Sequence, residues 1–182
     1  IIWMTDKTSP YVYKSTNGGS SWTSVFSTGA DAKAYGMVIG NDGVNEKIYI
    51  GNDGVGVIKS TNGGSSWSTV NPGGLAISDV ATSSNGTIVY ALDYSNKRVY
   101  KSTNSGTNWS QCAATGLALG GTTPASGIGA SPDGNTVIVA DSPADALFKS
   151  TDGCSTFSVI SSITTGTSAG QVNFPYQVEV RA

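Results

Sequence analysis

The 182-residue sequence contains no histidine, only two arginines, and charged residues make up only 12% of it. Without histidine the chain has no Ser-His-Asp triad, no imidazole metal site and none of the commonest general base. Two arginines and a net charge of −2 give no basic surface, so nucleic acid is not an expected partner. No apolar run approaches the roughly 20 residues of a membrane-spanning helix. No glycine-rich phosphate loop or metal-ligand spacing is present, so we expect neither a cofactor nor a metal.

The low charge and the 24 glycines favour a β-rich, turn-rich protein that works outside the cell, and we expect it to be secreted. The two cysteines, Cys112 and Cys154, either pair in an oxidising compartment or remain separate thiols, and the sequence leaves both readings open. Asn85 and Asn108 begin N-x-S/T sequons and are candidate glycosylation sites in a secretory protein. The first residue is not methionine, which fits either a processed precursor or an excised segment.

A nine-residue segment occurs four times in the chain. It reads KSTNGGSSW at 14–22 and at 59–67, KSTNSGTNW at 101–109 and KSTDGCSTF at 149–157. The first serines of the four copies are 45, 42 and 48 residues apart. A period in the forties is typical of one four-stranded propeller blade.

Short runs rich in Ile, Val and Tyr surround each copy, and none is long enough for a helix. Each unit predicts a strand, an Asn-Gly or Asp-Gly hairpin, two more strands, the nine-residue turn and a last strand. The predicted fold is therefore all-β: a single β-propeller domain over 1–182 with four four-stranded antiparallel blades. The predicted blades are about 1–30 plus 173–182, 31–75, 76–120 and 121–172.

Each repeat predicts a turn whose side chains bond to their own backbone. Ser and Asn close such turns, glycine accepts the unusual backbone angles, and the last aromatic buries an apolar face between sheets. The residues assigned to these turns are Ser15, Asn17, Gly19, Trp22, Ser60, Asn62, Gly64, Trp67, Ser102, Asn104, Gly106, Trp109, Ser150, Asp152, Gly153 and Phe157. The lysines before the turns, Lys14, Lys59, Lys101 and Lys149, are expected to form a solvated ring at the blade rims.

The segment S-T-N-G-G-S-S-W and its copies resemble the Asp-box, or BNR repeat, S-x-D-x-G-x-x-W, and the resemblance covers essentially the whole chain. That motif marks propellers of sialidases, xyloglucanase-type hydrolases, sortilin-type receptors and a photosystem II assembly factor. Three copies carry Asn in place of Asp, and the last copy has Phe157 in place of Trp. The resemblance implies a propeller and says little about activity.

The two ends of the chain bear on whether the propeller closes. The first run, IIWMTD at 1–6, has the pattern of a second strand, and YQVEVRA at 176–182 has the pattern of a first strand. Pairing these runs would complete blade 1 and close a four-bladed ring. An arc of a larger propeller is the alternative, because the resembling propellers usually have six or seven blades.

The families named by the resemblance can be tested by counting. Sialidases hold their substrate carboxylate with three arginines, and this chain has two, so we do not expect sialidase activity. A xyloglucanase-type hydrolase needs two carboxylates across a cleft. Asp79 and Glu179 lie on predicted first strands, which line the channel of a propeller, and are the acids that fit best. Most other acids have a turn role, and no catalytic residue is assigned.

Exposed aromatics are the remaining lead to function. Tyr11, Tyr35, Tyr94 and Tyr176 lie near predicted strand ends, where they could stack on sugars or contact a protein. The sequence thus favours an extracellular, non-catalytic propeller that binds a glycan or a protein, or assembles with copies of itself. The alternative is a xyloglucanase-type glycoside hydrolase domain or a fragment of one; an assembly factor ranks third.

Overall fold

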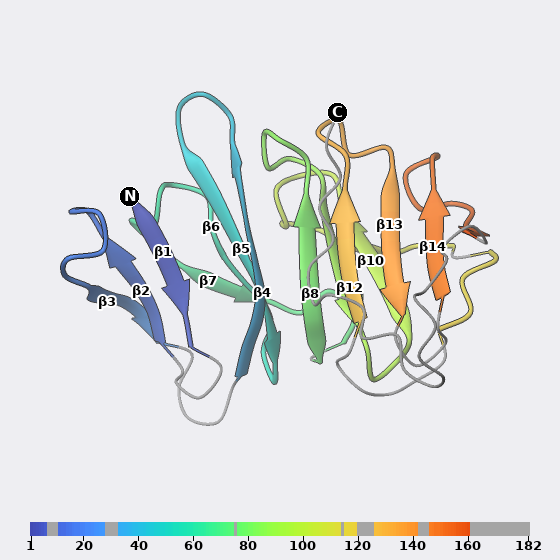
Figure 1. Ribbon diagram of the computed structural model, residues 1–182, viewed down its shortest axis with the longest axis horizontal. Helices are drawn as coiled ribbons and strands as arrows, with labels where there is room; N and C mark the ends of the chain where they lie inside the picture. The colour runs from blue at the N-terminus through green and yellow to red at the C-terminus, as the bar shows by residue number, and fades with distance from the viewer. Residues whose placement is uncertain are drawn as a thin grey trace, which may run out of the picture.

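The computed structural model of the chain describes residues 1–6, 11–27, 33–74, 76–113, 115–119, 126–141 and 146–160. All the regular secondary structure in these residues is β-strand. The strands form four separate antiparallel sheets that follow one another along the molecule (Figure 1). The prediction of an all-β propeller fold is confirmed.

Each sheet is one blade, and its strands are neighbours in chain order. Blade 1 contains β1 (Ile2–Thr5), β2 (Tyr11–Ser15) and β3 (Thr23–Ser27). Blade 2 contains β4 (Lys33–Asn41), β5 (Glu46–Asp53), β6 (Gly56–Ser60) and β7 (Ser68–Val70). Blade 3 contains β8 (Ile77–Thr82), β9 (Val89–Asp93), β10 (Arg98–Ser102) and β11 (Ser110–Gln111). Blade 4 contains β12 (Ser126–Ala130), β13 (Val137–Asp141), β14 (Ala146–Ser150) and β15 (Ser158–Val159).

The first strands of blades 2, 3 and 4 lie side by side, with β8 between β4 and β12 (Figure 1). Blade 1 has three strands among the described residues, and its β1 pairs with β2 as a second strand does in the other blades. The first strand predicted for this blade at 176–182 lies outside the described residues, together with Tyr176 and Glu179.

The four repeated segments form four turns of the same design, between the third and fourth strands of each blade. In the first turn the Ser15 hydroxyl accepts a hydrogen bond from the Gly19 amide at 2.9 Å, and the Asn17 side chain accepts one from the Ser21 amide at 2.9 Å. The same serine bond is 2.9 Å long in the other three turns. The same Asn or Asp bond measures 2.9, 2.8 and 3.0 Å in them. The side chains of each turn therefore satisfy backbone donors that no strand pairs.

Three of the four lysines that precede the turns reach into the turn of the next blade. Lys14 donates to the Gly63 carbonyl at 3.2 Å, and Lys101 donates to the Gly153 carbonyl at 3.1 Å. Lys59 donates to the carbonyls of Ser105 and Gly106 at 3.2 and 2.9 Å. The predicted solvated ring is therefore wrong for three of the four lysines: their ammonium groups connect neighbouring blades.

A second-strand aromatic accompanies two of these lysines and packs at the same junction. The Lys14 ammonium lies 4.7 Å from the centre of a Trp3 ring, and the Lys101 ammonium lies 5.6 Å from the centre of the Tyr90 ring. Such cation–π contacts add to the hydrogen bonds when the ammonium is partly desolvated. In line with this, burial lowers the pKa of the Lys59 ammonium at the junction of blades 2 and 3.

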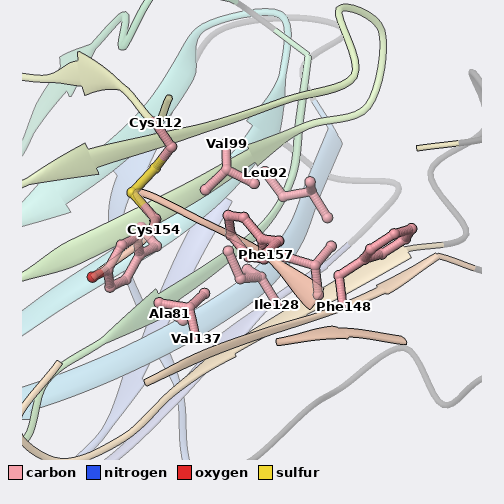
Figure 2. Close-up of a cluster of buried hydrophobic side chains, with 11 residues drawn as sticks. Ala81, Leu92, Val99, Cys112, Ile128, Val137, Phe148, Cys154 and Phe157 are labelled. Carbon is pink, nitrogen blue, oxygen red and sulfur yellow. A yellow bond between two sulfur atoms is a disulfide. The ribbon is translucent and has the colours of Figure 1, made fainter. Parts of the chain in front are cut away.

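Three clusters of buried hydrophobic side chains fill the three junctions between blades. The cluster between blades 3 and 4 contains Leu92, Val99, Ile128, Phe148 and Phe157 among others (Figure 2). The core is therefore divided among the junctions, so each blade is stabilised mainly by its neighbours.

The last aromatic of each turn, which was predicted to be buried, is buried to a different extent in each blade. Phe157 is 7% exposed, and Trp67 and Trp109 are half-buried against the clusters. The ring centre of Trp67 lies 5.7 Å from that of Trp3 and 5.7 Å from that of Phe26, and both of these residues belong to blade 1. Trp22 is 38% exposed, so the prediction is wrong there, because no described blade packs on that side of blade 1.

Cys112 and Cys154 form a disulfide with Cα atoms 5.5 Å apart (Figure 2). Cys112 follows β11 of blade 3, and Cys154 lies in the turn of blade 4. The covalent bond therefore joins the same kind of junction that Lys14, Lys59 and Lys101 join by hydrogen bonds.

The packing of aromatics on the turns can be tested with two equivalent glycines. A Cβ added to Gly64 would overlap the Trp3 indole, whereas at Gly19 the nearest atom is 3.8 Å away. Both glycines have positive φ, 80° and 91°, so both alanine variants lose about 1 kcal/mol in backbone strain. We expect Gly64→Ala to cost about 2 kcal/mol more than Gly19→Ala, measured by urea denaturation, because it displaces Trp3. Equal losses would contradict this packing.

Candidate functional site

Two of the predicted aromatics meet at one end of the junction between blades 2 and 3. Tyr35 lies in β4, where the pairing with β5 shifts register between Ala34 and Met37. Tyr94 follows the last residue of β9, and its amide donates to the Ala76 carbonyl at 3.3 Å. Asp53 ends β5 and forms an isolated bridge with Ala76. The strand ends of two blades thus converge on Asp53.

The carboxylate of Asp53 lies close enough to both phenols to interact with them electrostatically. Burial and the neighbouring Asp53 carboxylate raise the pKa of Tyr35. Burial, the Asp53 carboxylate and the other phenol raise the pKa of Tyr94 to about 12. Both tyrosines therefore stay protonated at neutral pH, and their phenols remain hydrogen-bond donors. The three side chains are partly exposed.

Asp93 lies beside this cluster and has a structural role. It is fully buried, its carboxylate accepts from the Asn96 amide at 3.0 Å, and it accepts from the Asn96 side chain at 2.7 Å. A Cβ at Gly74 would overlap this carboxylate. Asn52 has the equivalent position in blade 2, where it accepts from the Val55 amide at 3.1 Å. These residues close the hairpins that carry the cluster, and the complete burial of Asp93 keeps its carboxylate from contact with a ligand.

Asp79 lies on β8, the first strand of blade 3, as predicted, but it does not line an open cleft. Its side chain is 6% exposed. One carboxylate oxygen accepts from the Val80 amide and the other from the Ile128 amide of blade 4, both at 2.9 Å. Gly36 of blade 2 leaves no room for a Cβ beside it. Burial raises the pKa of Asp79 to about 7, against the lowering effect of the two amides.

The other sequence candidates lie elsewhere. Tyr11 is 42% exposed on β2 of blade 1, with its ring centre 6.1 Å from that of Tyr13. Asn85 and Asn108 are exposed in turns of blade 3, as a glycosylation site requires. The structure therefore brings together Tyr35 and Tyr94 and keeps Tyr11 apart from them.

Sequence reasoning missed Asp53, which it counted among the acids with a turn role. That role is right for Asp42, which accepts from the Val44 and Asn45 amides at 3.0 and 2.9 Å. Asp53 instead interacts with the side chains of Tyr35 and Tyr94. One signal could have separated it: Asn52 already has the hairpin-closing position that Asp93 has in blade 3, which leaves Asp53 one residue beyond it.

The chemistry open to the described part of the chain is that of side-chain hydrogen bonds and aromatic rings. Among the described residues, no group of three or more His, Cys, Asp and Glu side chains is placed to hold a metal ion. Within the same ranges, no helix is long and apolar enough to cross a membrane. The arrangement at Asp53 can accept hydroxyl donors and offer ring faces, which is the chemistry of a binding site.

Solved structures with the same fold are similar to this chain at low sequence identity. An ancestral GH74 enzyme has a TM-score of 0.60 and 21% identity over 85% of this chain, which corresponds to 22% of the enzyme. A chain of a nidogen/laminin complex has a TM-score of 0.61 and 14% identity over 84% of this chain and 59% of its own length. The GH74 xyloglucanase from Xanthomonas campestris has a TM-score of 0.51 and 15% identity over 77% of this chain and 20% of the enzyme. The chain thus spans about a fifth of these GH74 enzymes.

No curated protein matches the sequence. The likeness to the solved structures shows the fold alone, because each identity lies below 25%. A family model described as the DUF6242 beta propeller domain matches residues 1–155, which include all four repeated turns except the last two residues of the fourth. The chain belongs to the family of DUF6242 beta propeller domains.

Proposed function

We propose that this propeller is a non-catalytic binding module that works outside the cell and binds a neutral glycan at Tyr35, Asp53 and Tyr94. The observation that carries the proposal is the convergence of two partly exposed tyrosines from adjacent blades on Asp53, at strand ends whose backbones are paired. Rings carried on such paired backbone offer a preformed surface on which a ligand can stack. The carboxylate retains acceptor capacity for sugar hydroxyls, because each carboxylate oxygen has two lone pairs.

A glycan fits this site better than a charged ligand does. The chain has a net charge of −2 and Asp53 is an acid, so an anionic ligand would be repelled. A protein partner of the size usual for stable complexes needs about 800 Å² on each side. The cluster at Asp53 offers a small site, which suits a few sugar rings.

The extracellular location and the Asp-box character of the turns belong to the same proposal. The Cys112–Cys154 disulfide supports an oxidising compartment, since such bonds are rare in the cytosol of mesophiles. The serine and Asn or Asp bonds recur in all four turns, which supports assigning them to Asp-boxes.

The hydrolase alternative has one favourable feature and one unfavourable feature. Asp79 has a pKa raised to about 7, as a general acid requires. However, its carboxylate is 6% exposed, and its two oxygens already accept backbone bonds. A glycosidic oxygen cannot reach a carboxyl in that position. We therefore expect no release of reducing ends from xyloglucan by the chain alone.

Calorimetric titration with xyloglucan oligosaccharides tests the glycan site. This probe is chosen because a xyloglucanase shares the fold. We expect binding that Tyr35→Ala and Tyr94→Ala each weaken about tenfold or more, as loss of a stacking aromatic does. Tyr11→Ala is the matched control, because Tyr11 is an exposed tyrosine on another blade. Absence of binding to xyloglucan and to cello-, manno- and galacto-oligosaccharides, or equal weakening by the control, would overturn the site.

A further inference from the structure

The three junctions between the described blades follow one rule. The second strand of each blade places Trp3, Tyr49 or Tyr90 against the turn of the next blade. The lysine paired with that residue across the strands, Lys14, Lys59 or Lys101, donates to carbonyls of the same turn. Each junction therefore joins two different surfaces. The donor side carries the aromatic residue and the lysine, and the turn side carries the carbonyls that accept from the lysine.

Among the described residues, no blade packs against the turn side of blade 1. Ile2 and Met4 of β1 are 43% and 39% exposed. Their register partners on β2 are Ser15 and Tyr13. The same register positions in the other blades are buried to 1% exposure or less, and they are Ile48, Ile50, Val89, Ala91, Val137 and Val139. Trp22 adds a further 38% exposed ring beside this face. Four blades thus carry the same apolar positions, and only blade 1 leaves them exposed among the described residues.

Within the part of the chain that the structure describes, no blade packs against the donor side of blade 4. Lys149 pairs with Ile138 across β13 and β14, as Lys101 pairs with Tyr90 in blade 3. Lys149 is exposed and reaches no turn among the described residues, and Ile138 is partly exposed. Lys149 and the exposed face of blade 1 thus correspond in position to the two sides of the existing junctions.

We propose that the donor face of blade 4 docks on the turn face of blade 1 in a second copy of this chain, head to tail. In this junction Lys149 donates to the Gly18 carbonyl, the equivalent of Gly63, Ser105 and Gly153, and Ile138 covers Gly19. A second copy is favoured over the same copy because blades 1 and 4 lie at opposite ends of the row of sheets (Figure 1). Charge complementarity supports it too, since an ammonium meets a turn of outward carbonyls, as at three existing junctions.

Head-to-tail docking leaves the same two faces available at the far ends of the pair. The assembly therefore closes into a ring if the rotation per junction allows it, and otherwise continues as a chain of copies. In either case every junction uses one face of each kind, so disabling one face on all copies removes every junction.

Light scattering coupled to size exclusion tests this proposal on the full 182-residue chain. We expect a mass of two or more times 18.5 kDa for the wild type. Met4→Lys on one face and Lys149→Glu on the other should each give a monomer, since both positions are exposed and neither change disturbs a core. Lys33→Ala, at an exposed lysine of blade 2, is the control and should keep the wild-type mass.

Mixing the two variants separates this junction from other modes of association. Each variant keeps one intact face, so an equimolar mixture of Met4→Lys and Lys149→Glu should recover a species of twice the monomer mass. A symmetric interface would give no recovery, because each variant would carry its own defect into the same patch. A monomeric wild type, which is the outcome if blade 4 closes on blade 1 of its own chain, would also overturn the proposal.

Discussion

Removal of the Cys112–Cys154 disulfide is expected to lower the free energy of unfolding by roughly 4 kcal/mol. The bond spans a sequence separation of 42 residues, and cross-linking a loop of that length restricts the unfolded chain by about that much. It also fastens blade 4 to blade 3 covalently, whereas the lysines of the other two described junctions connect their blades by hydrogen bonds alone. Both cysteines are 4% exposed, so their loss additionally disturbs the cluster that includes Phe157 (Figure 2).

Urea denaturation of the double variant Cys112→Ala/Cys154→Ala measures this effect without relying on access of a reductant to the buried bond. We further expect blade 4 to unfold before the others in the variant, because each blade is stabilised by its neighbours. Hydrogen exchange of the backbone amides of β14, in blade 4, and of β2, in blade 1, would follow the two ends separately. A loss below about 1 kcal/mol with a single transition would contradict a stapling role for the disulfide.

The architecture was predictable because the turns are local. Ser15, Asn17 and Gly19 make their bonds within five residues of the chain, so the segment encodes its own conformation wherever it occurs. Four copies at a regular spacing then give the number of blades, and Ile- and Val-rich runs give the strands between them. Nothing distant in the sequence is needed for these inferences.

The junctions were not predictable in the same way. Lys14 precedes a turn of its own blade, yet its ammonium donates to the carbonyl of Gly63, 49 residues away. A lysine before a polar turn has the sequence pattern of a solvated residue, and only the rotation from blade to blade brings the two groups together. The prediction that Trp22 is buried was wrong for the same reason. Trp22 and Trp67 end segments of identical sequence, and their exposure differs only because a neighbouring described sheet covers Trp67.

The candidate site was predictable in part. Tyr35 and Tyr94 were identified from their position near strand ends, and their meeting at Asp53 depends on β4, β5 and β9 ending at one edge. Asp79 was placed on the correct strand, but its burial depends on three blades at once: β4, its own β8 and β12. Sequence patterns report the neighbours along a strand and not those across blades.

The burial of Asp79 predicts that the protein becomes less stable as the pH rises from 4 to 7. Its pKa is about 7 in the folded protein, against the ordinary aspartate value of 3.8 in the unfolded chain. Below pH 4 the group is protonated in both states, and the stability is fully present. Between these values the unfolded chain releases the proton and the folded protein retains it, so the free energy of unfolding falls with pH. Above pH 7 the loss is complete, and it amounts to roughly 4 kcal/mol at most.

Other titratable groups change the free energy of unfolding little over this pH range. The chain has no histidine, the side chain that ordinarily titrates between pH 5 and 8. Asp42 has a pKa lowered to about 2, because it accepts bonds from the Asn45 and Val44 amides. Bonds from Thr156 and Ser150 lower the pKa of Asp152 as well. These two acids contribute stability that is lost only as the pH falls below about 4, so the expected stability maximum lies near pH 4 to 5.

Denaturation midpoints of the wild type and of Asp79→Asn, measured from pH 4 to 8, test this expectation. The carboxamide has one acceptor oxygen in place of two, so one of the amides of Val80 and Ile128 loses its partner, at a cost of about 1 to 3 kcal/mol at low pH. The variant carries no titrating group there, so its stability should stay level between pH 5 and 7 while that of the wild type falls. The two curves should therefore converge or cross near neutral pH. Parallel curves would mean that Asp79 holds its charge in the folded state, with the Val80 and Ile128 amides outweighing the loss of solvation.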